Sequence, residues 1–159
     1  MLKLKKSVVY PGHGIGIIEK VENREILGSK QKYYIVYMEE KKMKVMIPVN
    51  KAEESGLRLV VTPKALNKIF SIFHSKKRSR IDKDWKIRYQ SFLARARSGD
   101  YRLTADVIRD LYRRGRKDDL SIMEKKLYEN TLRLLIAEVA LVKKISREDA
   151  EALVMKKLK

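Results

Sequence analysis

The sequence has no cysteine and only two histidines, and these absences exclude several kinds of site. Without cysteine the chain can form no disulfide and no thiolate zinc centre. No run of residues comes near the roughly 18 apolar positions that a membrane-spanning helix needs. The first ten residues are basic but lack the apolar stretch of a signal peptide. We therefore expect a cytoplasmic protein that uses neither a membrane nor a metal.

Glycine and proline are also scarce, with seven and three positions among 159, while 44% of the residues are apolar. This composition supports a packed core and argues against disorder. A chain of this length forms one ordinary domain or two small ones.

Recognisable catalytic motifs are missing as well. The acidic pairs Glu39–Glu40 and Asp118–Asp119 fall in charged turns, where nothing apolar surrounds them to make one carboxyl an acid and the other a base. The glycine-rich stretch 12–16 is followed by Ile17, where a dinucleotide-binding motif has its last glycine. We predict that the protein is not an enzyme and needs no cofactor.

The first 60 residues have the pattern of short strands joined by tight turns. Tyr34, Val36 and Met38 alternate with residues of the opposite face in the third predicted strand. The five predicted strands span residues 8–10, 15–25, 32–38, 43–49 and 57–61. So many short strands in so few residues predict a small β-barrel or curled sheet of the SH3 or Tudor type.

In the second predicted strand we expect Ile15, Ile17 and Val21 to face one side of the sheet. The nearby glycines, Gly14 and Gly16, indicate a bend or bulge at their own positions.

From Thr62 onward the apolar residues recur at helical spacing. Thr62 is suited to cap a helix and Pro63 to occupy its first position. Asp84 is placed to cap a second helix that ends at Gly99, and a third helix ends at Gly115.

Ser121 and Glu124 are spaced as a capping box at the start of a long fourth helix, and Ser146 begins a short fifth one. The predicted fold class is therefore α+β, with a Tudor-like or SH3-like β domain over 1–61 and an all-helical domain over 62–159. A basic segment at about 74–83 is the predicted linker.

Positive charge dominates the chain, with a formal net charge of +18. Residues 76–117 alone contain fifteen Lys and Arg against five acids. Within helices, Asp106 can neighbour Arg109, and Asp110 can neighbour Arg113 or Arg114. The remaining excess predicts a polyanionic partner, and nucleic acid is favoured over a membrane because the helices' apolar stripes are used by the bundle.

The single tryptophan, Trp85, lies at the front of this basic stretch. It shares a helix face with Tyr89, Phe92 and Ala96, which is also the pattern of a core anchor. Its place directly after Asp84, beside lysine and arginine, instead favours a side chain that meets a polyanion from a helix start. The sequence pattern leaves both possibilities open.

In order and spacing, the motifs resemble those of the CarD/CdnL family of bacterial transcription regulators. The likeness rests on the stretches Val8–Gly16, Ile47–Val49, Gly56–Arg58, Trp85–Tyr89, Val107–Arg114 and Ser121–Lys126. It covers nearly the full chain.

The resemblance implies a non-enzymatic, nucleoid-associated protein whose N-terminal module binds the β subunit of RNA polymerase. Its helical domain would contact promoter double-stranded DNA at the upstream edge of the bubble. There Trp85 would wedge into the minor groove and stabilise the open complex. A monomer is the expected state.

The implied site residues fall into two groups. Those implied for DNA are Trp85, Lys86, Arg88, Lys125, Arg113 and Arg114, and those implied for the polymerase are Arg24, Lys44, Met46 and Pro48. Met46 departs from the family pattern, which has an arginine there, and the nearby Lys44 is a possible substitute. Two other functions stay open, a general RNA- or ribosome-binding protein and a structural protein that coats the chromosome.

Overall fold

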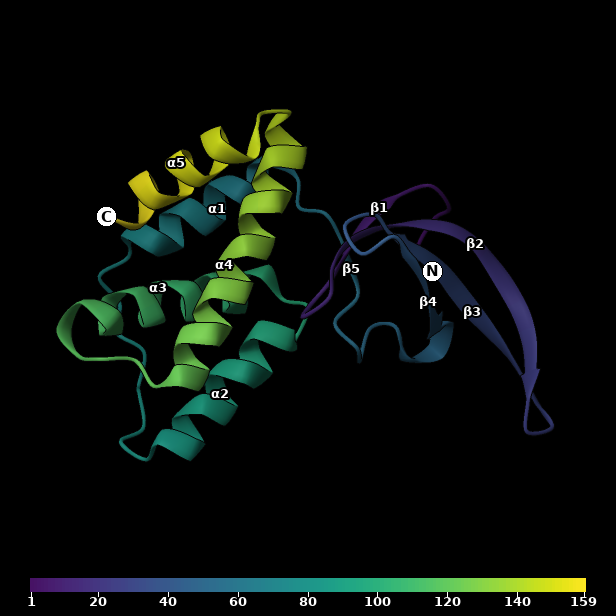
Figure 1. The fold of residues 1–159 in the computed structure, drawn as a ribbon, viewed down its shortest axis with the longest axis horizontal. Helices are drawn as coiled ribbons and strands as arrows, with labels where there is room; N and C mark the ends of the chain where they lie inside the picture. The colour runs from purple at the N-terminus through teal and green to yellow at the C-terminus, as the bar shows by residue number, and fades with distance from the viewer. The chain divides into compact units, whose positions relative to one another are not determined.

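The computed structural model describes all 159 residues and divides into two compact units, Met1–Val60 and Val61–Lys159 (Figure 1). The first unit is an antiparallel sheet and the second contains five helices. The predicted α+β fold class, a Tudor-like sheet followed by a helical domain, is confirmed.

The sheet has five strands in the order β4-β3-β2-β1-β5. Its strands are β1 (Ser7–Tyr10), β2 (Gly14–Ile26), β3 (Ser29–Met38), β4 (Met43–Pro48) and β5 (Arg58–Leu59), and a 3-10 turn, η1 (Val49–Lys51), follows β4. The edge strands β4 and β5 do not pair with each other, so the sheet stays open.

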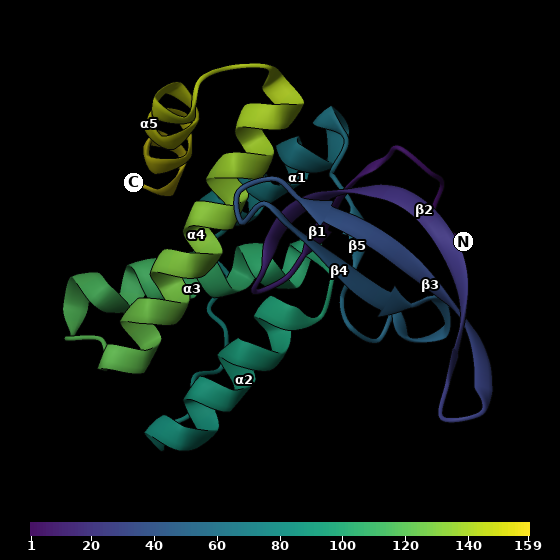
Figure 2. The same ribbon diagram turned by 45° about the vertical axis from the view of Figure 1, so that its right-hand side comes forward.

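Strands β2 and β3 form a hairpin that extends well past its neighbours (Figures 1 and 2). Its two-residue turn consists of Leu27 and Gly28, both with positive φ (52° and 79°), as a tight turn between twisted strands requires. Because β1 and β4 pair only with the inner part of the hairpin, its outer part is a two-stranded ribbon.

Tyr34, Val36 and Met38 share one face of β3, as predicted, and this face belongs to the core of the first unit. Ile15 and Ile17 share one side of β2, as predicted, and that side is opposite the core, where Ile18 is fully buried. The expectation that Val21 lies on the same side as Ile15 and Ile17 is wrong. A bulge between Ile18 and Lys20 changes the alternation and returns Val21 to the core side.

Gly16 explains why β2 can lie so close to β3. A Cβ at this position would approach the Val36 Cγ1 atom to 2.6 Å and the Tyr37 carbonyl oxygen to 2.9 Å. No side chain fits in that space, so the glycine is required by packing and the bulge lies elsewhere.

The second unit contains α1 (Pro63–His74), α2 (Trp85–Arg97), α3 (Tyr101–Lys117), α4 (Ile122–Lys143) and α5 (Arg147–Leu158). The predicted caps are confirmed: the side chains of Thr62, Asp84, Ser121 and Ser146 each accept backbone N–H groups of the helix that follows. Gly99 adopts a positive φ of 81° after α2. Gly115 does not end α3, which continues to Lys117.

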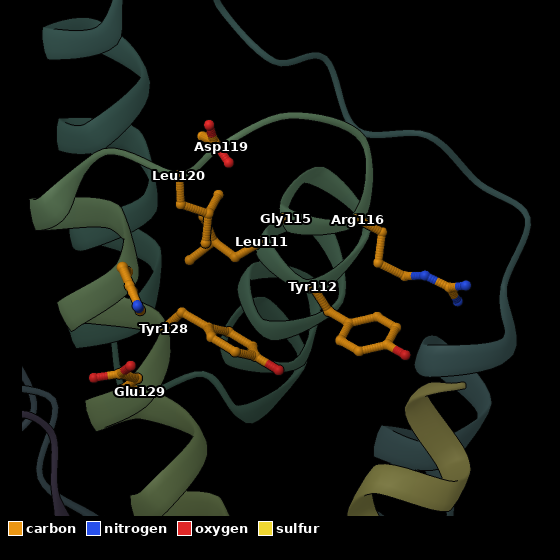
Figure 3. Close-up of a pocket in the computed structure, with 9 residues that line it drawn as sticks. Leu111, Tyr112, Gly115, Arg116, Asp119, Leu120, Tyr128 and Glu129 are labelled. Carbon is orange, nitrogen blue, oxygen red and sulfur yellow. The ribbon is translucent and has the colours of Figure 1, made fainter.

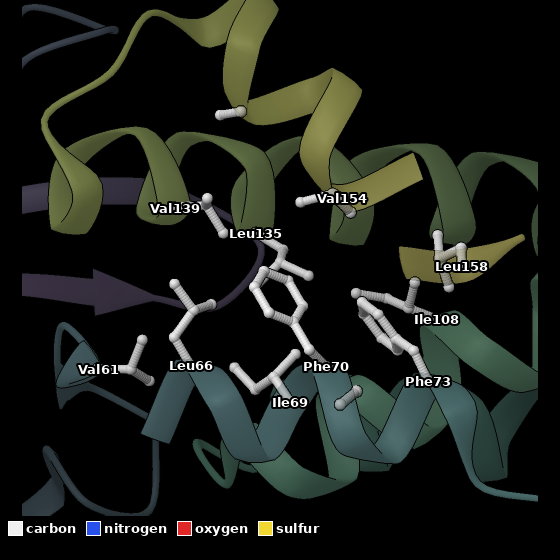
Figure 4. Close-up of a cluster of buried hydrophobic side chains, with 12 residues drawn as sticks. Val61, Leu66, Ile69, Phe70, Phe73, Ile108, Leu135, Val139, Val154 and Leu158 are labelled. Carbon is white, nitrogen blue, oxygen red and sulfur yellow. The ribbon is translucent and has the colours of Figure 1, made fainter. Parts of the chain in front are cut away.

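Two hydrophobic clusters hold the helices together. The larger one joins α1, α3, α4 and α5 around Phe70 and Phe73 (Figure 4). The smaller one joins α2, α3 and α4 through Phe92, Leu111 and Leu127. The basic segment predicted as a linker follows α1 without regular secondary structure, and it lies inside the helical unit.

Candidate nucleic-acid interface

Trp85 is the first residue of α2, and its surroundings fix the start of that helix. The Asp84 Oδ1 atom accepts the backbone N–H groups of Lys86 at 2.9 Å and Ile87 at 3.3 Å. Asp82 in turn accepts the Asp84 N–H at 2.9 Å. These two bonded carboxylates hold the turn that presents the indole.

The indole of Trp85 is not part of the core. Along its helix face, Phe92 and Ala96 are buried and Tyr89 is half-buried, but Trp85 is 48% exposed. The Lys86 ammonium lies 5.8 Å from the centre of the Trp85 ring. This face of α2 is therefore buried only in part, and at the start of the helix it presents an accessible aromatic side chain next to a cation.

The guanidinium of Arg88 is engaged by contacts within the protein. Its residue is buried, and its Nε donates to the Glu124 Oε1 atom in an ion pair between α2 and α4. Its Nη1 donates to the carbonyl oxygens of Asp82 and Lys83. This side chain thus fixes the segment before Trp85 to the start of α4. A DNA contact by Arg88 stays a prediction.

Glu124 is the centre of this arrangement. Burial alone would raise its pKa, but hydrogen bonds from Arg88 and the Ser121 backbone, with the charges of Arg88 and Arg114, outweigh burial and lower the pKa. The Ser121 N–H donates to Glu124 Oε2 at 3.0 Å, which completes the predicted capping box. One carboxylate thus both caps α4 and binds α2.

Arg113 and Arg114 differ in how far their guanidinium groups are occupied by contacts within the protein. Arg113 donates to the carbonyl oxygens of Phe73, Ser75 and Lys77, so it caps the end of α1 and secures the segment after it. A DNA contact by Arg113 stays a prediction, and its guanidinium already has these three acceptors. The Arg114 side chain is 24% exposed, with its Nε 4.0 Å from Glu124, and it stays a candidate.

A buried charge cluster on α3 was missed by the sequence analysis. Arg109 is 2% exposed and pairs with Asp106 at 3.0 Å, as predicted, and with Asp110 at 3.1 Å. Asp110 lies 3.6 Å from Arg95, so the expectation that it neighbours Arg113 or Arg114 is wrong. The signal available in the sequence was that Arg109 and Asp110 fall beside the buried Ile108 of the same helix.

The cations that remain on the surface are lysines and arginines in nearly equal number. Lys125 is exposed in the first turn of α4 and forms no ion pair, and the same is true of Lys86 in α2. The other exposed cations of the basic stretch are Lys76, Lys77, Arg78, Arg80, Lys83, Arg97, Arg102, Arg116 and Lys117. They keep the surface of the helical unit strongly positive.

A pocket of about 480 Å³ lies between α3 and α4 (Figure 3). Tyr112 and Arg116 line it from α3, and Tyr128 and Lys125 line it from α4. Burial, with a smaller effect of Tyr112, raises the pKa of the Tyr128 hydroxyl, which therefore stays protonated at neutral pH. Acidic side chains, Asp119 and Glu129, share the rim, so the pocket has no uniform charge.

In the first unit the four residues implied for the polymerase share one face of the sheet. Lys44, Met46 and Pro48 alternate along the edge strand β4. Pro48 lies opposite Tyr33, which pairs with Glu22, two residues before Arg24 on β2. Because side chains alternate along a strand, this register places all four on the face opposite the core.

Two of the cations on this face are paired with acids. Arg24 Nη2 lies 3.0 Å from Glu22 Oε2, and Lys44 Nζ lies 3.1 Å from Glu19 Oε2. The hydrogen bonds from Lys20 and Arg24 lower the pKa of Glu22. Met46 is 39% exposed, so an apolar side chain stands at the position where the family pattern has an arginine.

No cluster of three or more His, Asp or Glu side chains could hold a metal ion. None of the helices has both the length and the apolar character to cross a membrane.

In a comparison with known proteins, both halves of the chain match models of domain families. Residues 2–61 match the model of the CarD-like/TRCF RID domain, and residues 68–155 match the model of the CarD C-terminal domain. The putative transcription factor YdeB of Bacillus subtilis (strain 168) is 36% identical over 152 residues, which cover 96% of this chain and 99% of the relative. With both domain models matched in order and a relative aligned along almost its whole length, the chain belongs to the CarD family of transcription regulators.

Proposed function

We propose that this regulator acts without enzymatic chemistry. Its first unit binds RNA polymerase through the β subunit, and its helical unit stabilises the open promoter complex. Trp85 inserts into the minor groove at the upstream edge of the melted DNA. The observation that carries this proposal is the half-exposed indole at the start of α2 with the Lys86 ammonium beside its ring.

Charge supports DNA as the partner of this indole. The helical unit keeps many exposed cations, whereas the acids closest to Trp85 in the sequence, Asp82 and Asp84, are engaged in backbone hydrogen bonds. Unpaired Lys86 and Lys125 are the proposed phosphate contacts. Phosphate contacts would hold the domain on the duplex while the ring supplies the apolar wedge.

The required energy is small. Unstacking one base step costs a few kcal/mol, and an apolar side chain in the gap offsets part of that cost. About 1.4 kcal/mol against collapse of the bubble changes the equilibrium tenfold. Attachment to the polymerase raises the local concentration of the helical unit, so weak and sequence-tolerant DNA binding is sufficient.

The surface proposed for the polymerase combines charged and apolar groups. Arg24 and Lys44 lie on one face of the sheet with Met46 and Pro48. Near Arg24, the apolar Leu27 is fully exposed at the tip of the hairpin. An exposed apolar tip next to a mixed face is typical of a protein contact, while a nucleic-acid surface would lack so many paired acids.

The central test is the Trp85→Ala variant of the full chain, with Ile87→Ala as the matched control. Ile87 is 58% exposed on the same helix, two residues away. We expect Trp85→Ala to shorten the lifetime of the open complex about tenfold with the circular dichroism spectrum unchanged, and Ile87→Ala to leave the lifetime unchanged. If the Trp85→Ala variant unfolds, or if both changes shorten the lifetime equally, Trp85 has a structural role and the proposal is wrong.

The polymerase contact is tested separately with Arg24→Glu. We expect this variant to lose capture of the polymerase while its binding to DNA alone stays the same, since Arg24 is on the first unit and Trp85 on the second. Retention of ribosomal RNA without polymerase capture by the unmodified protein would instead favour the RNA-binding alternative.

A further inference from the structure

The first turn of α4 carries an apolar surface that the proposed function does not yet use. Ile122 is 89% exposed and Met123 is 46% exposed, at the first and second positions of the helix. Single exposed apolar residues are common on protein surfaces, but adjacent ones next to another exposed aromatic residue mark contact surfaces. The question is therefore whether these two side chains and Trp85 lie at the same place.

The contacts between α2 and α4 answer it, because the two helices run side by side in the same direction. Phe92, in the second turn of α2, shares a hydrophobic cluster with Leu127, in the second turn of α4. One turn earlier in each helix, Arg88 is paired with Glu124. Figures 1 and 2 both show the starts of α2 and α4 close together.

The first residues of both helices lie within one turn of the Arg88–Glu124 pair. Trp85 lies three residues before Arg88, and Ile122 and Met123 directly precede Glu124 by two and one. A residue rises about 1.5 Å along a helix, so each of these steps is a single turn or less. The indole and the two aliphatic side chains therefore stand at the same end of the α2–α4 pair.

The charges around this end suit nucleic acid. Four exposed lysines surround it on the two helices and the segment before α2: Lys83, Lys86, Lys125 and Lys126. The acids of the same turns are Asp82 and Asp84, which accept backbone N–H groups, and Glu124, which is buried in its ion pair. An apolar tip within a ring of unpaired cations is complementary to bases within a phosphate backbone.

We propose that Ile122 and Met123 form a second apolar blade that contacts the same DNA as Trp85, so that the wedge is built from two helices. This inference rests on the proposed function. The indole occupies the opened base step, and the aliphatic side chains pack against the sugars and base edges next to it, where they exclude water from the gap. Arg88 and Glu124 keep the two blades at a fixed separation.

The test uses the full chain with polymerase and a linear promoter fragment, at saturating protein. The variant is the double change Ile122→Ala and Met123→Ala, and the control is Leu141→Ala, which removes a 45% exposed side chain near the other end of α4. We expect the double variant to shorten the open-complex lifetime about fivefold, from the apolar contact it removes, and the control to change it less than 1.5-fold, about the limit of the assay. When the double change is combined with Trp85→Ala, the fold-reduction in open-complex lifetime should be smaller than the product of the two separate fold-reductions. The reason is that both groups of side chains contact one DNA site.

The outcomes separate this inference from the function on which it rests. If Trp85→Ala shortens the lifetime and the double variant does not, the second blade is wrong and the proposed function stands. If neither change has an effect, both are wrong. If the double variant loses polymerase capture in proportion to its lifetime, its side chains touch the polymerase and the inference is overturned.

Discussion

The two units handle positive charge in different ways. The sheet unit has twelve basic and seven acidic residues, and two cations on its candidate face, Arg24 and Lys44, lie next to carboxylates. The helical unit has 26 basic and thirteen acidic residues. Its buried acids Glu124 and Asp110 pair with arginines, and the lysines next to Trp85 are left unpaired. A count of charges predicts a polyanion partner, but the location of the acids decides which surface can bind it.

The largest difference between the two units should follow from removing the buried ion pair of the helical unit. We expect Arg88→Met to destabilise the helical unit by about 3–5 kcal/mol, because Glu124 would be left buried without its partner. Hydrogen exchange should show the loss in α2 and α4 and leave the sheet unchanged. Arg24→Met, which breaks an exposed pair, is the control and should have almost no effect. Equal protection losses in both units would contradict the division into two units.

The sheet unit has its own sensitive position at Gly16. Gly16→Ala should destabilise this unit by about 1–3 kcal/mol, because the new Cβ would meet Val36 and the Tyr37 carbonyl oxygen. Denaturation followed by hydrogen exchange should locate the loss in β2 and β3. Gly28→Ala is the control: nothing lies within 4 Å of its Cβ position, and only the positive φ is unfavourable, by about 1–2 kcal/mol. A tolerated Gly16→Ala would show that the strands can separate more than this packing allows.

Acid should weaken the helical unit through Glu124. Its pKa in the folded protein lies below the value of 4.5 that the unfolded chain has, so the stabilisation is fully present above pH 4.5 and is lost as the pH falls through the folded pKa. Urea unfolding between pH 3 and pH 6, with the emission of Trp85 as the signal, measures this slope. In Glu124→Gln the slope should be reduced, and an unchanged slope would assign it to other carboxylates.

The smallest expected effects come from replacing single surface lysines. They test whether DNA binds to the helical unit and not to the sheet unit. Lys86→Ala and Lys125→Ala should each reduce the salt dependence of DNA binding by about one unit in the log–log slope. Lys44→Ala, in the sheet unit, should leave the slope unchanged because that lysine is paired with Glu19. The measurement is a titration of the full chain with duplex DNA at four salt concentrations. A change of slope with Lys44→Ala would place DNA on the first unit as well.

Local features of the fold could be predicted from the sequence because they depend on neighbouring residues. The caps Thr62, Asp84, Ser121 and Ser146 need only a side-chain oxygen at the right distance from the first backbone N–H groups. The helical core stripes follow from spacing alone. The exposure of Trp85 was left open by the pattern and depends on where α4 begins beside α2.

The features that sequence did not predict depend on partners far along the chain. Arg88 finds Glu124 36 residues later, and Arg113 finds carbonyl oxygens 36 to 40 residues earlier. The same residue types in a basic run look like surface, and only tertiary packing distinguishes them. Gly115 is a similar case, because Leu120 packs beside it and the helix passes through the glycine. In β2, one extra residue in the bulge moves Val21 to the side opposite Ile15 and Ile17.

The double use of Glu124 has a consequence for how the protein matures. Its Oε2 atom caps α4, while its Oε1 atom pairs with Arg88 of α2, so one carboxylate fixes the starts of both helices. A nascent chain that has emerged only as far as α3 would hold α2 through its packing on α3, but Arg88 would lack its carboxylate partner. The start of α2, with Trp85, is therefore fully fixed only late in synthesis, when the first turn of α4 is present.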